Sequence, residues 1–198
     1  MSKTLADVES MPPSAELAAL LAGVDPAHID DDYDLLETIA GWERVIAWAQ
    51  ASEAKAVAEF ARRPWALGQS ADAARAARGE VGQVKRQFAH DEIAARLCVS
   101  PAAAGQRVWL ATALAGTLTA TGTALAAGVI DAQKARVIAD GCRHLDPATA
   151  LEVETRVVPR AGEQTTSRLK QTVRRAVISA DPIAAQRRGK AAAAERGV

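Results

Sequence analysis

The residues best suited to chemistry in this sequence are its few histidines, its two cysteines and one pair of adjacent carboxylates. Asp91 and Glu92 follow His90 directly, a combination that can hold a metal ion or exchange a proton in acid–base catalysis. Acids are also favoured at the start of a helix by its dipole, and we prefer this interpretation. Cys142 and His144 lie two residues apart without further ligands nearby, so the sequence predicts no metal site there.

A second group of residues has the types and spacing of a DNA-binding unit. Two helix-forming phrases, DEIAARL over residues 91–97 and PAAAGQRVWLATA over residues 101–113, are separated only by Cys98, Val99 and Ser100. In a helix-turn-helix, Ser100 would cap the second helix and Pro101 would begin it. This spacing predicts a helix-turn-helix-like unit over about 91–113, and the alternative is a plain helical corner.

The second helix of this unit would present its polar residues to DNA. Arg107 can bind a phosphate or a guanine edge, and Gln106 can pair with adenine. We expect Leu97 to help bury the first helix. Two residues oppose the interpretation: Cys98 stands where glycine is usual, so it needs a costlier backbone conformation, and Gly105 weakens a helix by about 1 kcal/mol.

Basic residues accumulate in the last third of the chain and can contact phosphates. The alternative for each pair is an ordinary solvated helix face. The residues predicted to contact DNA are therefore Ser100, Gln106, Arg107, Lys170, Arg174, Arg175, Arg187 and Arg188, with Arg168 and Lys190 extending the basic surface.

The elements that must position these residues are helices. Alanine is abundant, β-branched residues rarely cluster, and no segment has the pattern of a long strand. A long helix is predicted over about 32–63, with an apolar stripe that includes Ile39, Trp42, Ile46 and Phe60; Trp42 is expected in the core. The predicted fold is an all-α multi-helix bundle. Capping residues predict further helix starts at Ser14, Asp131 and Asp146, and Gly128 predicts a helix end.

Composition and charge limit the classes of protein that this sequence can represent. Apolar residues make up 49% and charged residues 24% of the 198 residues, and the net charge is zero. The charge is unevenly distributed, since residues 1–60 hold 3 Lys and Arg against 12 Asp and Glu, whereas residues 61–198 hold 21 against 12. The basic residues 61–198 can bind a polyanion, or they can simply neutralise the acidic residues 1–60 within the fold. With two isolated cysteines, no secretory signal and no membrane-length apolar run, we expect a cytoplasmic protein.

Several phrases, taken in order, resemble a known family. EIAARLCVSPAAAGQRVWLATAL, TALAAGVIDAQKARVIADG and LDPATALEVETRVVPRAGEQTTSRLKQTVRRAVISADP together are similar to the actinobacterial domain of unknown function 222, found in the thirteen-E-twelve repeat proteins of mycobacteria. The resemblance covers roughly residues 35–198 and implies a helical region that precedes a C-terminal HNH endonuclease domain. The nuclease ligands have no counterpart here, because the three histidines are isolated and no CxxC pair is present. Family members also tend to carry Leu-Pro where this chain reads Leu118-Thr119.

These observations predict a non-catalytic helical module that binds or targets double-stranded DNA, with no cofactor, no metal and no small-molecule substrate. The alternative is a helical scaffold without nucleic-acid binding, pairing as a homodimer or with a partner helix through residues 32–63. The predicted organisation is a short helix and acidic linker over 1–30, followed by a single helical domain over 31–198 that ends before the mixed segment and the HNH domain of the family.

Overall fold

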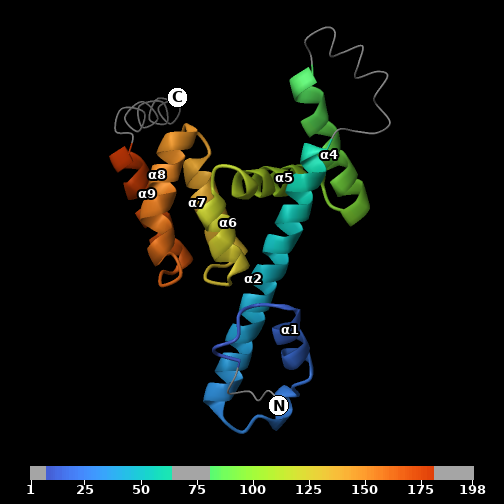
Figure 1. Ribbon diagram of the computed structural model, residues 1–198, viewed down its shortest axis with the longest axis vertical. Coiled ribbons are helices and arrows are strands. Elements are labelled where there is room, and N and C mark those ends of the chain that lie inside the picture. The colour runs from blue at the N-terminus through green and yellow to red at the C-terminus, as the bar shows by residue number, and fades with distance from the viewer. Residues whose placement is uncertain (1–7, 64–80, 181–198) are drawn as a thin grey trace, which may run out of the picture. The chain divides into compact units, whose positions relative to one another are not determined.

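The computed structural model describes residues 8–63 and 81–180, with backbone only for 81–88, and every regular element in these ranges is a helix (Figure 1). The prediction of an all-α fold is confirmed. The chain divides into two units, Met1–Ala51 with Thr117–Val198, and Ser52–Gly116. The predicted boundary near residue 30 remains a prediction.

From α4 onward, the helices follow one another through short connections. They are α1 (Ala15–Ala22), α2 (Asp32–Arg62), α4 (Val81–Leu97), α5 (Pro101–Ala115), α6 (Thr119–Ala126), α7 (Ala132–Cys142), α8 (Pro147–Val157) and α9 (Thr166–Ala180), with 3-10 turns η2 (Pro26–His28) and η3 (Val158–Arg160).

The helix boundaries agree with the capping residues of the sequence. The side chain of Ser14 accepts a hydrogen bond from Leu17 N, and that of Asp131 accepts one from Lys134 N at 2.7 Å. Asp146 caps α8 in the same way. Gly128 has a φ of +69°, the left-handed conformation in which helices commonly end on glycine.

The N-terminal segment packs against α2 at a glycine. Val8, Leu17, Leu21 and Val45 form a buried cluster between α1, the segment before it and α2. A Cβ atom at Gly41 would lie 2.9 Å from Val8 Cγ1 and 3.1 Å from Leu21 Cδ1, so only glycine allows this approach. The buried side of α2 is therefore the side of Gly41 and Val45.

The apolar stripe predicted to face the core of α2 is instead exposed. Ile39 is 54% exposed, Ile46 45% and Trp42 38%, so the prediction that Trp42 lies in the core is wrong. The reason is the packing at Gly41, which turns α2 so that smaller side chains meet α1. The helix period alone cannot show which of two sides will be covered.

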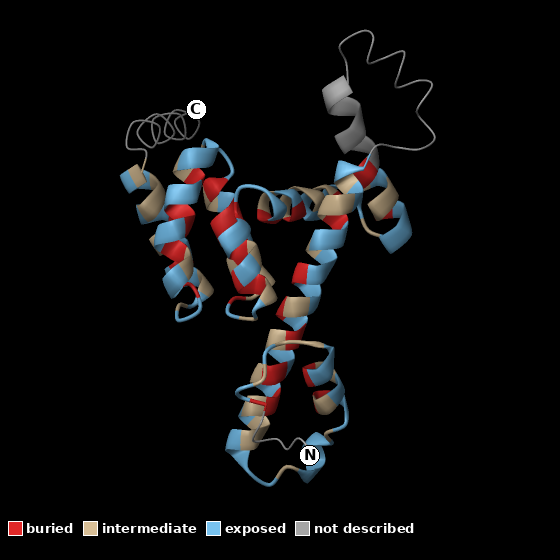
Figure 2. Ribbon diagram, viewed as in Figure 1, coloured by how far each residue is buried: buried red, intermediate tan, exposed pale blue. Residues whose placement is uncertain are grey.

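The second segment of the first unit, from Thr117 onward, contains α6 to α9, and here α9 packs against both α7 and α8. Buried residues form stripes along these helices, including Ile138, Val153 and Leu169 (Figure 2). The helices α7 and α9 approach closely where Gly141 meets Val173, because a Cβ atom at Gly141 would lie 2.2 Å from Val173 Cγ1. The basic residues of α9 are thus held on a helix whose apolar side is covered.

A buried carboxylate joins α6 to α8. Glu154 is fully buried, and its Oε1 accepts hydrogen bonds from Thr121 N and from Thr121 Oγ1, both at 2.7 Å. The N-cap residue of α6, Leu118, makes no side-chain capping bond. Glu154 therefore supplies, from another helix, the acceptor that the first turn of α6 lacks.

Candidate nucleic-acid interface

The turn between α4 and α5 is built as a tight helical corner. Cys98 adopts a φ of +53°, the only positive φ of a non-glycine residue in the described ranges. Val99 N donates to Ala94 O at 3.0 Å, which closes the end of α4 in a Schellman motif. Ser100 Oγ accepts a hydrogen bond from Ala103 N at 3.2 Å, and Pro101 begins α5. The strained conformation expected of Cys98 and the cap expected of Ser100 are both present.

The two helices of the corner meet through alanines. Ala94 of α4 and Ala104 of α5 are buried, which allows the backbones to approach closely. Ile93 and Val108 are half-buried. Leu97, which we expected to bury the first helix, is 45% exposed, so that expectation is wrong. The contact between small residues leaves Leu97 at the open edge of the pair.

The first helix of the corner is longer than predicted. It begins at Val81 rather than Asp91, so Asp91 and Glu92 lie in the middle of α4. The interpretation of this pair as acids at a helix start is therefore wrong. The Nε2 atom of His90 lies 3.3 Å from Asp91 Oδ1. Among the described residues, no group of three or more His, Cys, Asp or Glu side chains is placed to hold a metal ion.

The residues of α5 that were predicted to contact DNA are exposed, but one of them already forms an ion pair within the protein. Gln106 and Arg107 both lie on the solvent side of α5. Arg107 Nη1 forms an ion pair with Glu53 Oε1 of α2 at 2.8 Å. A phosphate would have to compete with this carboxylate for Arg107. Glu53 was not among the predicted site residues, although it is the polar residue that interrupts the apolar stripe of α2.

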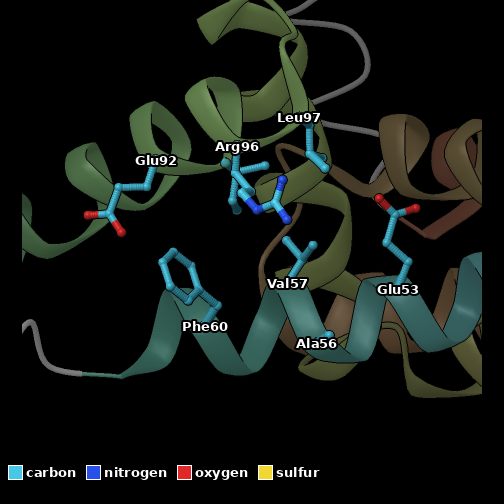
Figure 3. A pocket seen from close by; sticks show the side chains of 8 residues that line it. Glu53, Ala56, Val57, Phe60, Glu92, Arg96 and Leu97 are labelled. Carbon is cyan, nitrogen blue, oxygen red and sulfur yellow. The ribbon is translucent and has the colours of Figure 1, made fainter.

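An apolar groove of about 510 Å³ lies beside this ion pair, between the C-terminal part of α2 and α4 (Figure 3). Val57 and Phe60 extend from α2 toward α4, and Ile93 and Leu97 line the groove from α4. Charged side chains also line it: Glu53 and Glu92 lie toward its two ends, and Arg96 lies between them. Charges of both signs are thus present at the groove, so its chemistry is not that of a phosphate site.

The strongest basic surface in the described residues lies on α9. Leu169 and Val173 form its buried side, and the exposed remainder carries Arg168, Lys170, Arg174 and Arg175, here named the α9 basic face. The sequence of α9 contains no Asp or Glu, and within the described residues none of these four cations forms an ion pair. Arg187, Arg188 and Lys190 lie outside the described residues.

The cysteines differ in environment. Cys98 is exposed at the corner, whereas Cys142 is buried at the end of α7. Burial, and secondly the charge of Glu154, raise the pKa of the Cys142 thiol to about 11. A thiol with this pKa is protonated at neutral pH, and it is therefore a poor nucleophile.

The comparisons with known proteins give one match. A family model described as "Domain of unknown function (DUF222)" matches residues 47–198. The searches of curated proteins and of solved structures found no match. Of the helices in the described ranges, none has by itself the length and apolar character to cross a membrane, and α5 and α6 meet these criteria only when combined as a bent pair.

Proposed function

The chain belongs to the family of the domain of unknown function 222, and from this premise we propose that it is a non-catalytic helical module that binds DNA. The observation that carries the proposal is the α9 basic face.

The charges of α9 suit the phosphate backbone better than they suit a base edge. Arg174 and Arg175 stand next to each other on the exposed side, with Lys170 one turn before Arg174. Such a row of cations binds DNA by releasing condensed counterions, without reading sequence. Sequence preference, if the corner contributes it, would come from Gln106 and Arg107.

The proposal is tested by fluorescence anisotropy of the full chain with labelled duplex DNA over a series of salt concentrations. Replacing both Arg174 and Arg175 by alanine should lower the slope of log K against log salt by roughly 1.8, about 0.9 for each lost phosphate contact. The matched control replaces the exposed Arg136 and Arg160, which removes the same charge outside α9. An equal loss in the control, or no salt-dependent binding by the unmodified chain at low salt, would refute the proposal.

The corner needs a separate test because Arg107 already has a partner. If Arg107 contacts DNA, Arg107→Ala should weaken binding, whereas Glu53→Gln should strengthen it by releasing the guanidinium. If the ion pair serves only the fold, both variants should leave DNA affinity unchanged. The second result would remove the corner from the interface and leave the α9 basic face untouched.

A second candidate function is a helical protein-interaction scaffold, and the exposed apolar side chains of α2 favour it. Large apolar residues grouped on a surface are typical of binding sites for other proteins. Ile39→Ser and Ile46→Ser are suitable variants for measuring self-association, because both residues are exposed. Val45 is unsuitable, because it belongs to the buried cluster with α1 and its replacement would disturb the fold. Sedimentation of the unmodified chain as a strict monomer would argue against pairing with itself.

A further inference from the structure

The exposed side of α2 in the first unit is apolar over three helical turns. Leu36 is 62% exposed and precedes Ile39, Trp42 and Ile46 at intervals of three, three and four residues. At 100° per residue these four side chains fall within a sector of about 120°, which we name the α2 apolar face. The face spans about 15 Å along the helix axis, the length of a short helical binding site.

The charges on and around this face are acidic. Asp32 and Glu43 lie in the same sector as Ile39 and are exposed. Residues 8–51 contain nine Asp and Glu against a single basic Lys or Arg residue, Arg44. The guanidinium of Arg44 donates to Val8 O, toward the N-terminal segment and away from the α2 apolar face.

This combination of charge and shape selects one kind of occupant. A second copy of the same face would bring carboxylates against carboxylates, and a nucleic acid or an anionic lipid surface would be repelled in the same way. A helix that carries apolar residues along one side and Lys or Arg beside them would bury the apolar side chains and neutralise Asp32 and Glu43. We infer that the α2 apolar face is a docking site for a basic amphipathic helix of a partner protein.

This inference rests on the second candidate function, protein interaction, and is independent of DNA binding. Apolar burial gives the affinity, and the acidic residues select the partner by charge. Removing one buried aliphatic side chain should therefore weaken binding about tenfold or more. Reversing the charge of Glu43 should reduce discrimination between basic and acidic partners.

The test is isothermal titration calorimetry of the full chain with a synthetic amphipathic peptide, about 18 residues long so that it forms a helix, with leucines on one side and lysines on the other. The comparison peptide carries glutamates in place of the lysines. Ile39→Ser is matched by Leu151→Ser, which removes an equally exposed aliphatic side chain from α8, and Glu43→Lys is matched by Glu163→Lys.

We expect the lysine peptide to bind at least tenfold more tightly than the glutamate peptide, with a negative heat-capacity change that reports apolar burial. Ile39→Ser should weaken binding and reduce the heat-capacity change, whereas Leu151→Ser should do neither. Equal effects of the two serine variants, or equal binding of both peptides, would overturn the inference. A chain that forms homodimers but does not bind the lysine peptide would overturn the inference while preserving the scaffold function. A monomer that binds neither peptide would overturn the inference and would also argue against pairing of the chain with itself.

Discussion

Replacing Glu154 tests whether a carboxylate from α8 holds the first turn of α6. Both hydrogen bonds from Thr121 end on one oxygen, Oε1, at 2.7 Å, and both residues are fully buried. In Glu154→Leu, the amide and the hydroxyl of Thr121 lose their acceptor without gaining water. Hydrogen bonds to a charged group contribute roughly 1.5–3 kcal/mol each, but burial of the carboxylate itself is unfavourable.

These opposing effects give an expected loss of about 3 kcal/mol for Glu154→Leu in the free energy of unfolding, because two buried donors lose their acceptor at about 1–3 kcal/mol each, while the cost of burying the carboxylate is removed. Glu154→Gln should lose only about 1 kcal/mol, because its amide oxygen can accept the same two bonds at lower strength. Adding Thr121→Val to Glu154→Leu should cost less than the sum of the two single changes, since the orphaned hydroxyl is removed with its partner.

The assay is urea unfolding followed by circular dichroism, together with hydrogen exchange at the Thr121 amide. Glu152→Leu is the control, because Glu152 lies on the exposed side of α8 in an ion pair with Arg156, where a loss of about 0.5 kcal/mol or less is expected. The reasoning is wrong if Glu154→Leu is as stable as the unmodified chain. It is equally wrong if the Thr121 amide exchanges no faster in that variant.

Three further predictions concern the corner, a thiol and a cap. Cys98→Gly should raise the free energy of unfolding by about 0.5–1 kcal/mol in urea unfolding, because glycine adopts φ +53° without strain and only part of this gain is lost to the more flexible unfolded chain; an unchanged or lower value would contradict the strain. In the folded chain at pH 8, a thiol reagent should modify Cys98 and leave Cys142 intact until urea unfolds the chain, since burial raises the Cys142 pKa to about 11; rapid labelling of both would contradict this. The hydrogen bonds from the side chain and backbone of Thr149 lower the pKa of Asp146, so its contribution to stability is complete above the unfolded pKa and is lost as the pH falls through the lower folded pKa. The difference in Tm between the unmodified chain and Asp146→Ala should therefore shrink below about pH 4, and a constant difference would contradict the assignment.

Much of the helical framework could be predicted from the sequence because the signals are local. A serine or aspartate before a helix, with proline at its first position, satisfies the free amides of that helix whatever surrounds it, as at Ser100 and Asp146. Gly128 is a local signal of the same kind, since few other residues tolerate its φ.

Features that depend on contacts between distant segments could not be predicted in this way. The exposed side of α2 follows from the approach of Leu21 at Gly41. Gly41 stands beside Trp42 in the sequence, but the segment that packs against it belongs to another helix and is not indicated by the pattern of α2. Likewise, Glu53 lies 54 residues before Arg107, so the ion pair that occupies the predicted DNA contact has no sequence signature. The burial of Glu154 did have a signal, because it falls on the same side of its helix as Ala150 and Val157.

The order of the two units along the chain has a consequence for how the protein is made. Residues up to Ala51 belong with Thr117 and the residues after it, yet the whole of Ser52–Gly116 is translated in between. At a translation rate of about 5–20 residues per second, several seconds pass between synthesis of the first segment and synthesis of α6 to α9. During that interval the contact between Arg44 of α2 and Gly128 cannot form, so conditions that slow translation of the middle unit should lower the yield of native protein more than those that slow its end.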